Sequence, residues 1–73
     1  MHITIEYCQE WNYDPIAASL AAELTKKFGA TCELIASGGG VFEVVVDGEL
    51  IYSKKDSGRH ADTGEVARLI EKL

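Results

Sequence analysis

The sequence is poor in the residues that cross-link a small fold. Cys8 and Cys32 are its only cysteines, no Cys-x-x-Cys pair occurs, and His2 and His60 are its only histidines. Two thiols are too few for a disulfide scaffold, and the spacing of these four residues matches no zinc site. We therefore expect neither a disulfide framework nor a structural metal.

Positive charge and long apolar runs are also scarce. The 7 Lys and Arg against 12 Asp and Glu leave a net charge of −5, which disfavours nucleic-acid binding because that needs a clustered basic surface. No apolar run approaches the roughly 20 residues that span a bilayer. Residues 1–5 follow a strand pattern without a basic leader. We expect no membrane anchor and no signal peptide, and a cytoplasmic protein.

The length and composition indicate one folded domain. A chain of 73 residues has room for a single domain, 1–73, with a modest core. Its hydrophobic share of 47% is typical of globular proteins, and no polar low-complexity tract occurs. Disorder is not predicted.

Four segments have the pattern of β-strands. Residues 2–7 and 30–36 alternate between apolar and polar side chains, which is typical of half-buried strands. Residues 41–46 and 49–53 are rich in β-branched and aromatic side chains. Asp47-Gly48 lies between them and predicts a two-residue hairpin turn, so we expect these two strands to pair antiparallel.

Two segments have the pattern of amphipathic helices. Asp14 supplies an N-cap oxygen, Pro15 suits the first helical position, and Gly29 provides a left-handed stop. The second helix is predicted to begin at Asp62, with Glu65 three residues later as a capping-box partner. After each of these starts, apolar side chains recur at helical spacing.

The order βαβββα predicts an α/β fold with two layers. A helix between the first two strands indicates a right-handed parallel unit, so the sheet is mixed and four-stranded, with both helices on one face. The predicted core contains large apolar side chains from the helices and the third strand: Leu20, Leu24, Phe42, Val44, Leu69 and Ile70. In the hairpin, the expected register places Val45, Leu50 and Tyr52 together on one face of the sheet. The uncovered face is partly apolar and would suit a homodimer or a protein partner.

The strand directions predict a candidate site at one edge of the sheet. Cys8 and the loop 37–40 follow two parallel strands, and the hairpin returns to that same edge. Ligands of open α/β sheets bind where strands end. The candidate catalytic residue is Cys8, and the candidate binding residues are Trp11, Tyr13, Ser37, Gly38, Gly39, Lys54 and Lys55.

Each component also has a purely structural interpretation. Cys8 is either a small buried residue or a reactive thiol at a partly exposed strand end. Cys32 is expected to be structural, shielded in an inner strand and slower to react than Cys8. The glycines precede a strand rather than a helix, so turn geometry explains them better than phosphate binding does. Neither His2 nor His60 has a carboxylate at catalytic spacing, so a histidine-driven mechanism has no support.

The aromatic and the basic side chains at that edge also have two possible roles each. Trp11 and Tyr13 either anchor the loop to the core or contact a partner. The basic group of Lys54, Lys55, Arg59 and His60 either binds a ligand or belongs to a solvated loop.

Three segments together resemble a known family: YCQEWNYDP at 7–15, GVFEV at 40–44 and DGELIYSKK at 47–55. The chain resembles the selenoprotein W family, the Rdx group of thioredoxin-like proteins, over nearly its whole length. The resemblance implies a thioredoxin-like fold and a role in cell redox homeostasis, with no bound cofactor.

The redox motif of that family is Cys-x-x-Cys or Cys-x-x-selenocysteine. Cys8 matches its first position, but Trp11 stands at the second and cannot resolve a mixed disulfide. Three readings stay open: Cys8 acts as a monothiol with glutathione or a protein thiol as co-substrate, Cys32 resolves instead, or redox activity is lost. In the last case the fold is a protein-binding module that uses the Cys8–Trp11 loop or the open sheet face. Whether the chain is an enzyme stays open with them.

Overall fold

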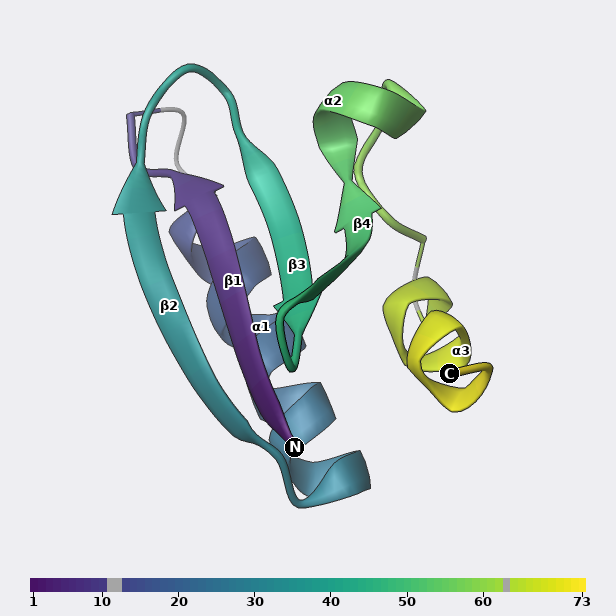
Figure 1. Cartoon of the computed structure of the whole chain (residues 1–73). Coiled ribbons are helices and arrows are strands. Elements are labelled where there is room, and N and C mark those ends of the chain that lie inside the picture. Colours follow the sequence, from purple (N-terminus) through teal and green to yellow (C-terminus); the bar gives the residue numbers. More distant parts are fainter. Residues whose placement is uncertain (11–12, 63) are drawn as a thin grey trace.

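The structure of the protein, a computed structural model, describes residues 1–10, 13–62 and 64–73. Its helices and strands follow one another along the chain as labelled in Figure 1. They are β1 (His2–Cys8), α1 (Asp14–Phe28), β2 (Thr31–Ser37), β3 (Phe42–Val46), β4 (Glu49–Ser53), α2 (Lys54–Ser57) and α3 (Glu65–Glu71). None of these helices is both long and apolar enough to cross a bilayer.

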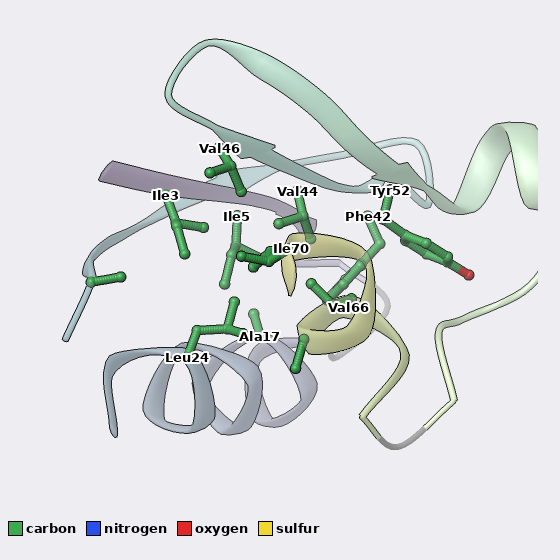
Figure 2. Close-up of a cluster of buried hydrophobic side chains, with 12 residues drawn as sticks. Ile3, Ile5, Ala17, Leu24, Phe42, Val44, Val46, Tyr52, Val66 and Ile70 are labelled. Carbon is green, nitrogen blue, oxygen red and sulfur yellow. The ribbon is translucent and has the colours of Figure 1, made fainter. Parts of the chain in front are cut away.

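The four strands form one mixed sheet in the order β2-β1-β3-β4. β1 pairs parallel with β2 and antiparallel with β3, and β3 pairs antiparallel with β4. Both α1 and α3 lie on the same face of the sheet (Figure 2). The predicted α/β fold, with a four-stranded mixed sheet and helices on one face, is therefore confirmed. The single-turn helix α2 was not predicted, and it begins where the Ser53 hydroxyl accepts the Asp56 N–H at 3.4 Å.

The hydrophobic core lies between the sheet and the two longer helices. Alternate residues of β1 and β3 project toward α1 and α3, as the alternation requires (Figure 2). The fully buried large side chains are Phe42, Ile3, Ile5, Leu24, Val44 and Val66. Of the predicted core, Leu24, Phe42, Val44 and Ile70 are buried, and Leu20 and Leu69 pack partly buried against it.

The predicted end of the first helix is confirmed, whereas the predicted first residues of both helices are shifted. Gly29 takes a left-handed φ of 65° and its N–H bonds the Thr25 carbonyl at 2.9 Å, as a helix stop does. Asp14 was wrongly predicted as the N-cap, because Tyr13 occupies that position and Asp14 is already helical. α3 begins at Glu65 instead of Asp62, although the expected contact exists: the Glu65 carboxylate accepts the Asp62 N–H at 2.9 Å.

Two predictions about the sheet were wrong. β2 is an edge strand, because β1 uses its two sides for β2 and β3, so Cys32 does not lie in an inner strand. A bulge between Val44 and Val45 shifts the hairpin register, so that Tyr52 lies opposite Val44 on the core face. Leu50 stays opposite Val45.

Candidate functional site

The end of β1 is held between the β2–β3 connection and the approach to α1. Cys8 lies opposite Ser37, its N–H donates to the Val41 carbonyl at 2.8 Å, and the Gln9 N–H donates to the Ser37 carbonyl at 3.0 Å. On the other side, the Cys8 carbonyl accepts the Tyr13 N–H at 3.3 Å. The structure thus brings the candidate cysteine, Tyr13 and the glycine loop together. Trp11 lies outside the described residues.

The thiol of Cys8 is fully enclosed, with 0% of the residue exposed. This corrects the expectation of a partly exposed strand end. The physical reason is that the strand does not stop in solvent: backbone hydrogen bonds on both sides hold the neighbouring segments close to Cys8. A reagent can reach this sulfur only after one of those segments moves.

The glycine loop is shaped by backbone geometry. Gly39 and Gly40 have φ of 70° and 73°, a conformation that side chains disfavour. Gly38 lies so close to the Glu10 carboxylate that an added Cβ would be 2.8 Å from its Oε1. A carboxylate against the loop opposes anion binding there, which supports the turn interpretation of these glycines.

An aromatic cluster of Tyr13, Phe42 and His60 lies at this edge of the sheet. The ring of His60 makes edge-to-face contacts with Tyr13 at 4.4 Å and with Phe42 at 5.3 Å between centroids. Lys54 completes the group, with its Nζ 5.8 Å from the Tyr13 ring centroid. Tyr13 is therefore an anchor that ties the segment after Cys8 to the core, one of the two roles that its sequence left open.

The sequence places His60 in a basic loop with Lys54, Lys55 and Arg59, but it does not predict that the ring is buried. Both of its ring nitrogens are buried and lack a hydrogen-bond partner among the described residues. Burial, and secondly the charge of Lys54, lowers the pKa of His60 below its ordinary value. No sequence signal predicts this burial, because a single histidine in a polar loop has no periodicity that places it in the core.

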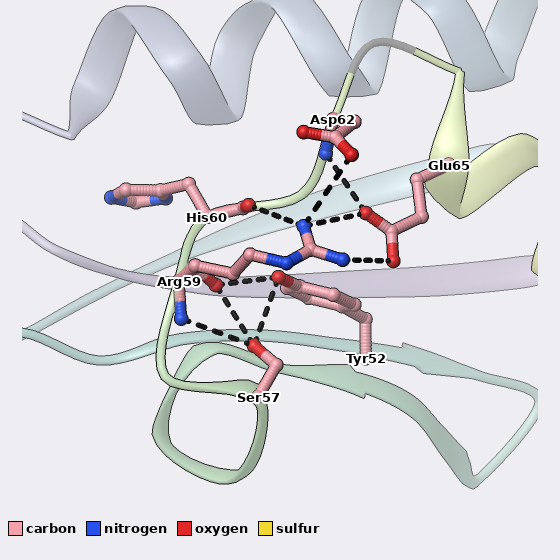
Figure 3. A network of polar contacts seen from close by, with 6 residues as sticks. All are labelled: Tyr52, Ser57, Arg59, His60, Asp62 and Glu65. Carbon is pink, nitrogen blue, oxygen red and sulfur yellow. Dashed lines mark hydrogen bonds and ion pairs between the residues drawn. The ribbon is translucent and has the colours of Figure 1, made fainter.

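Arg59 organises the segment that carries His60 (Figure 3). Its guanidinium binds both carboxylate oxygens of Glu65, at 2.8 and 3.0 Å, and the His60 carbonyl at 2.9 Å. The Tyr52 hydroxyl donates to the Arg59 carbonyl. The hydrogen bond from Arg59 lowers the pKa of Glu65 to about 2. Arg59 is thus engaged within the fold rather than available to a ligand.

The remaining candidate residues lie around the same end of the sheet. Figure 1 shows α2, which carries Lys54 and Lys55, at the end where β1 and β2 terminate. Lys55 and Gly39 are exposed, and Lys54 is half-buried beside Tyr13.

Cys32 lies too far from Cys8 to bridge to it. Cys32 is opposite Ile3 and Cys8 is opposite Ser37, so five residue steps along β1 separate them. At about 3.3 Å per residue this is ~16 Å, against the ~7 Å limit between Cα atoms of a disulfide. Cys32 is half-buried on the edge strand and its Sγ accepts the Thr25 hydroxyl at 3.5 Å. The expectation that Cys32 is the better shielded thiol was therefore wrong.

Comparison with known proteins bears on the sequence resemblance directly. The model of the Rdx family matches residues 2–72. Selenoprotein W of Gallus gallus is 36% identical over 67 residues, covering 86% of this chain and 79% of that protein. Migration and invasion enhancer 1 of Mus musculus is 30% identical over 59 residues, covering 80% of this chain. The chain spans about half of that second relative, 51% of its length.

Solved structures share the fold over almost the entire chain. A crystal structure of a selenoprotein W-related protein from Vibrio cholerae superposes with a TM-score of 0.89 and 26% identity, covering 99% of this chain and 94% of that one. A Bordetella parapertussis protein superposes with a TM-score of 0.88 and 24% identity, covering 97% and 94% of the two chains. The second likeness supports the fold alone.

Proposed function

The chain belongs to the Rdx family of selenoprotein W-like proteins, and from this premise we propose that it is a redox protein in which Cys8 works as a monothiol. Cys8 occupies the first position of the family's redox motif, and Trp11 occupies the second. The observation that carries the monothiol mechanism is the ~16 Å between Cys8 and Cys32, estimated from five strand residues at about 3.3 Å each. No second cysteine of the chain reaches Cys8 in the native fold.

The proposed reaction is thiol–disulfide exchange. The Cys8 thiol loses its proton to solvent, and the thiolate attacks one sulfur of oxidised glutathione or of a protein disulfide. The bond between Cys8 and that sulfur forms while the original disulfide bond breaks, and the departing thiolate takes up a proton. An external thiol, such as reduced glutathione, then attacks the mixed disulfide and regenerates Cys8. This chemistry suits a compartment rich in glutathione, such as the cytoplasm.

Burial of Cys8 makes this exchange a gated reaction. With 0% of the residue exposed, attack requires the backbone bonds that flank Cys8 to open, including the one from the Tyr13 N–H. Local opening has its own free-energy cost, so the observed rate is the intrinsic rate reduced by the open fraction. The aromatic cluster that anchors Tyr13 would then set how often the thiol becomes accessible.

Glutathionylation measured by intact mass spectrometry tests the proposal. In a Cys32→Ser background, oxidised glutathione should add once, slowly, and the adduct should persist until an external thiol is supplied. Cys8→Ser in the same background is the matched control and should take up none. Trp11→Cys restores the family's spacing and should release glutathione with formation of an internal disulfide.

A redox-inactive protein-binding module is the second candidate function. The enclosure of the Cys8 thiol favours it, because a buried cysteine is often only a small apolar residue. If the Cys32→Ser protein acquires no glutathione under conditions that modify a model thiol, monothiol chemistry is refuted and the binding module becomes the better account.

A further inference from the structure

One face of the sheet is covered by neither of the longer helices, α1 and α3. α1 and α3 both pack on the face to which Ile3 and Ile5 project (Figure 2), so the alternate residues of each strand project to the other side. The strand register groups them as Glu33, Thr4, Val45 and Leu50 in one row and Ile35, Glu6, Glu43 and Ser53 in the next. We call this surface the open face.

The open face is acidic and holds no Lys or Arg side chain from the strands. None of the four strands contains a Lys or Arg, whereas Glu6, Glu33 and Glu43 all project to this surface. Glu33 lies on the edge strand β2, and its Oε1 is 3.6 Å from Nε2 of the exposed His2 ring. The charge of the open face is therefore negative and almost entirely uncompensated from within the fold.

Glu6 and Glu43 are direct cross-strand neighbours in the middle of the open face. Directly opposed like charges destabilise a sheet, so this pair opposes folding. Among the described residues neither has a cationic partner, and Glu43 receives only the Ser53 hydroxyl, at 3.1 Å. The arrangement leaves two half-buried carboxylates side by side, with the geometry to share one ammonium or guanidinium group from outside.

Apolar side chains lie on both sides of that acidic pair. Ile35 is 40% exposed on β2, next to Glu6, and Leu50 is 48% exposed on β4, next to Val45. Large aliphatic groups that stay exposed beside polar side chains are typical of an interaction surface.

The negative charge of the open face indicates which kind of molecule can bind there. A second copy of the chain would bring two Glu6–Glu43 pairs against each other, because a two-fold interface is self-complementary. Nucleic acids and anionic lipids would be repelled in the same way. A basic amphipathic polypeptide fits the open face, because its cationic groups neutralise the glutamates and its aliphatic groups cover the exposed apolar side chains.

We propose that the open face docks a segment of a protein partner in which Lys or Arg alternates with aliphatic residues. One cationic group binds between Glu6 and Glu43, while neighbouring aliphatic side chains cover Ile35 on one side and Val45 and Leu50 on the other. This inference is independent of Cys8, and it assigns the protein a binding surface beyond the redox edge.

Peptide binding by fluorescence anisotropy tests the proposal. The probe is a short fluorescein-labelled peptide in which Lys and Arg alternate with Val and Leu, and the control probe carries Glu at every Lys and Arg. The double variant Glu6→Gln/Glu43→Gln should weaken binding of the basic probe by about tenfold or more, because charge-assisted hydrogen bonds are lost. The control Glu23→Gln/Glu71→Gln removes the same charge from α1 and α3 and should change affinity less than about twofold.

A second pair of variants tests the aliphatic part of the surface. Ile35→Ser should weaken binding, whereas Ile16→Ser, on α1 and similarly exposed at 42%, should not. Amide shifts on adding the basic probe should change along all four strands and not along α1. Equal affinities for the two double variants, or shifts centred on the helices, would overturn the proposal. A concentration-dependent dimer that Ile35→Ser dissociates would also overturn it and identify a second copy as the occupant.

Discussion

Replacing His60 by phenylalanine tests the physical interpretation of the aromatic cluster. A neutral imidazole has one donor and one acceptor nitrogen, and in His60 both are buried without a partner among the described residues. A buried unsatisfied polar group costs about 1–3 kcal/mol. Phenylalanine removes both nitrogens but keeps a ring between Tyr13 and Phe42. His60→Phe should therefore raise the free energy of unfolding by about 1–3 kcal/mol at pH 8, because the unsatisfied nitrogens are gone.

The pH dependence of stability provides a second, independent readout. The pKa of His60 is lowered in the folded state, so the unfolded chain binds a proton first as the pH falls. Stability is then complete above the unfolded pKa of about 6.5 and declines below it toward the folded pKa. This decline should be absent from the His60→Phe variant. The pKa of His60 is lowered first by burial of the ring and second by the positive charge of Lys54.

Urea unfolding followed by circular dichroism, repeated between pH 8 and pH 5, measures both effects. The gain in free energy of unfolding appears as a higher midpoint urea concentration at an unchanged slope. His2→Phe is the matched control, because the side chain of His2 is 55% exposed, and it should change stability by less than about 0.5 kcal/mol. A His60→Phe variant no more stable than the wild type at pH 8 would refute the claim that the nitrogens are unsatisfied.

Three further measurements test other parts of the structure. The guanidinium of Arg59 lowers the pKa of Glu65 to about 2, so the stabilising contribution of this carboxylate is complete above pH 4.5 and lost as the pH falls toward 2. In thermal melts over that range, the wild type should lose this stability as the pH falls, and the Glu65→Gln variant should not. In native protein, Cys32 should react with a chromogenic disulfide reagent faster than Cys8, and equal rates in the two single Cys→Ser variants would contradict the burial of Cys8. Glu6→Gln should raise the free energy of unfolding by about 0.2–1 kcal/mol, because it relieves repulsion from Glu43, and a loss of stability in urea would contradict that pairing.

The acidic pair and the redox edge are separable features of one small sheet. Access to Cys8 depends on the backbone hydrogen bonds that hold segments over the end of β1. The side chains of Glu6 and Glu43 take no part in those bonds. Variants of the open face should therefore leave glutathionylation of Cys8 unchanged. This separation allows the redox function and the docking surface to be tested without confusion between them.

The sequence by itself determined the features that depend on neighbouring residues. Gly29 ends α1 because only a left-handed residue closes that turn, and Asp47-Gly48 forms the hairpin because both adopt positive φ, 48° and 87°. Alternation predicted β1 and β2, β-branched and aromatic content predicted β3 and β4, and the order of elements predicted the layers. These are local steric and hydrophobic preferences, so they can be read before any long-range contact is known.

Only the tertiary structure decided which residues are enclosed and which face each other. Cys8 is buried because residues 37–41, distant in sequence, and the nearby Tyr13 bond to the backbone around it. His60 is buried because Arg59 holds its loop against Tyr13 and Phe42. The Glu6–Glu43 pair depends on the register between two strands that are far apart along the chain. Burial and cross-strand pairing are properties of long-range contacts, and no local pattern around a single cysteine, histidine or glutamate encodes them.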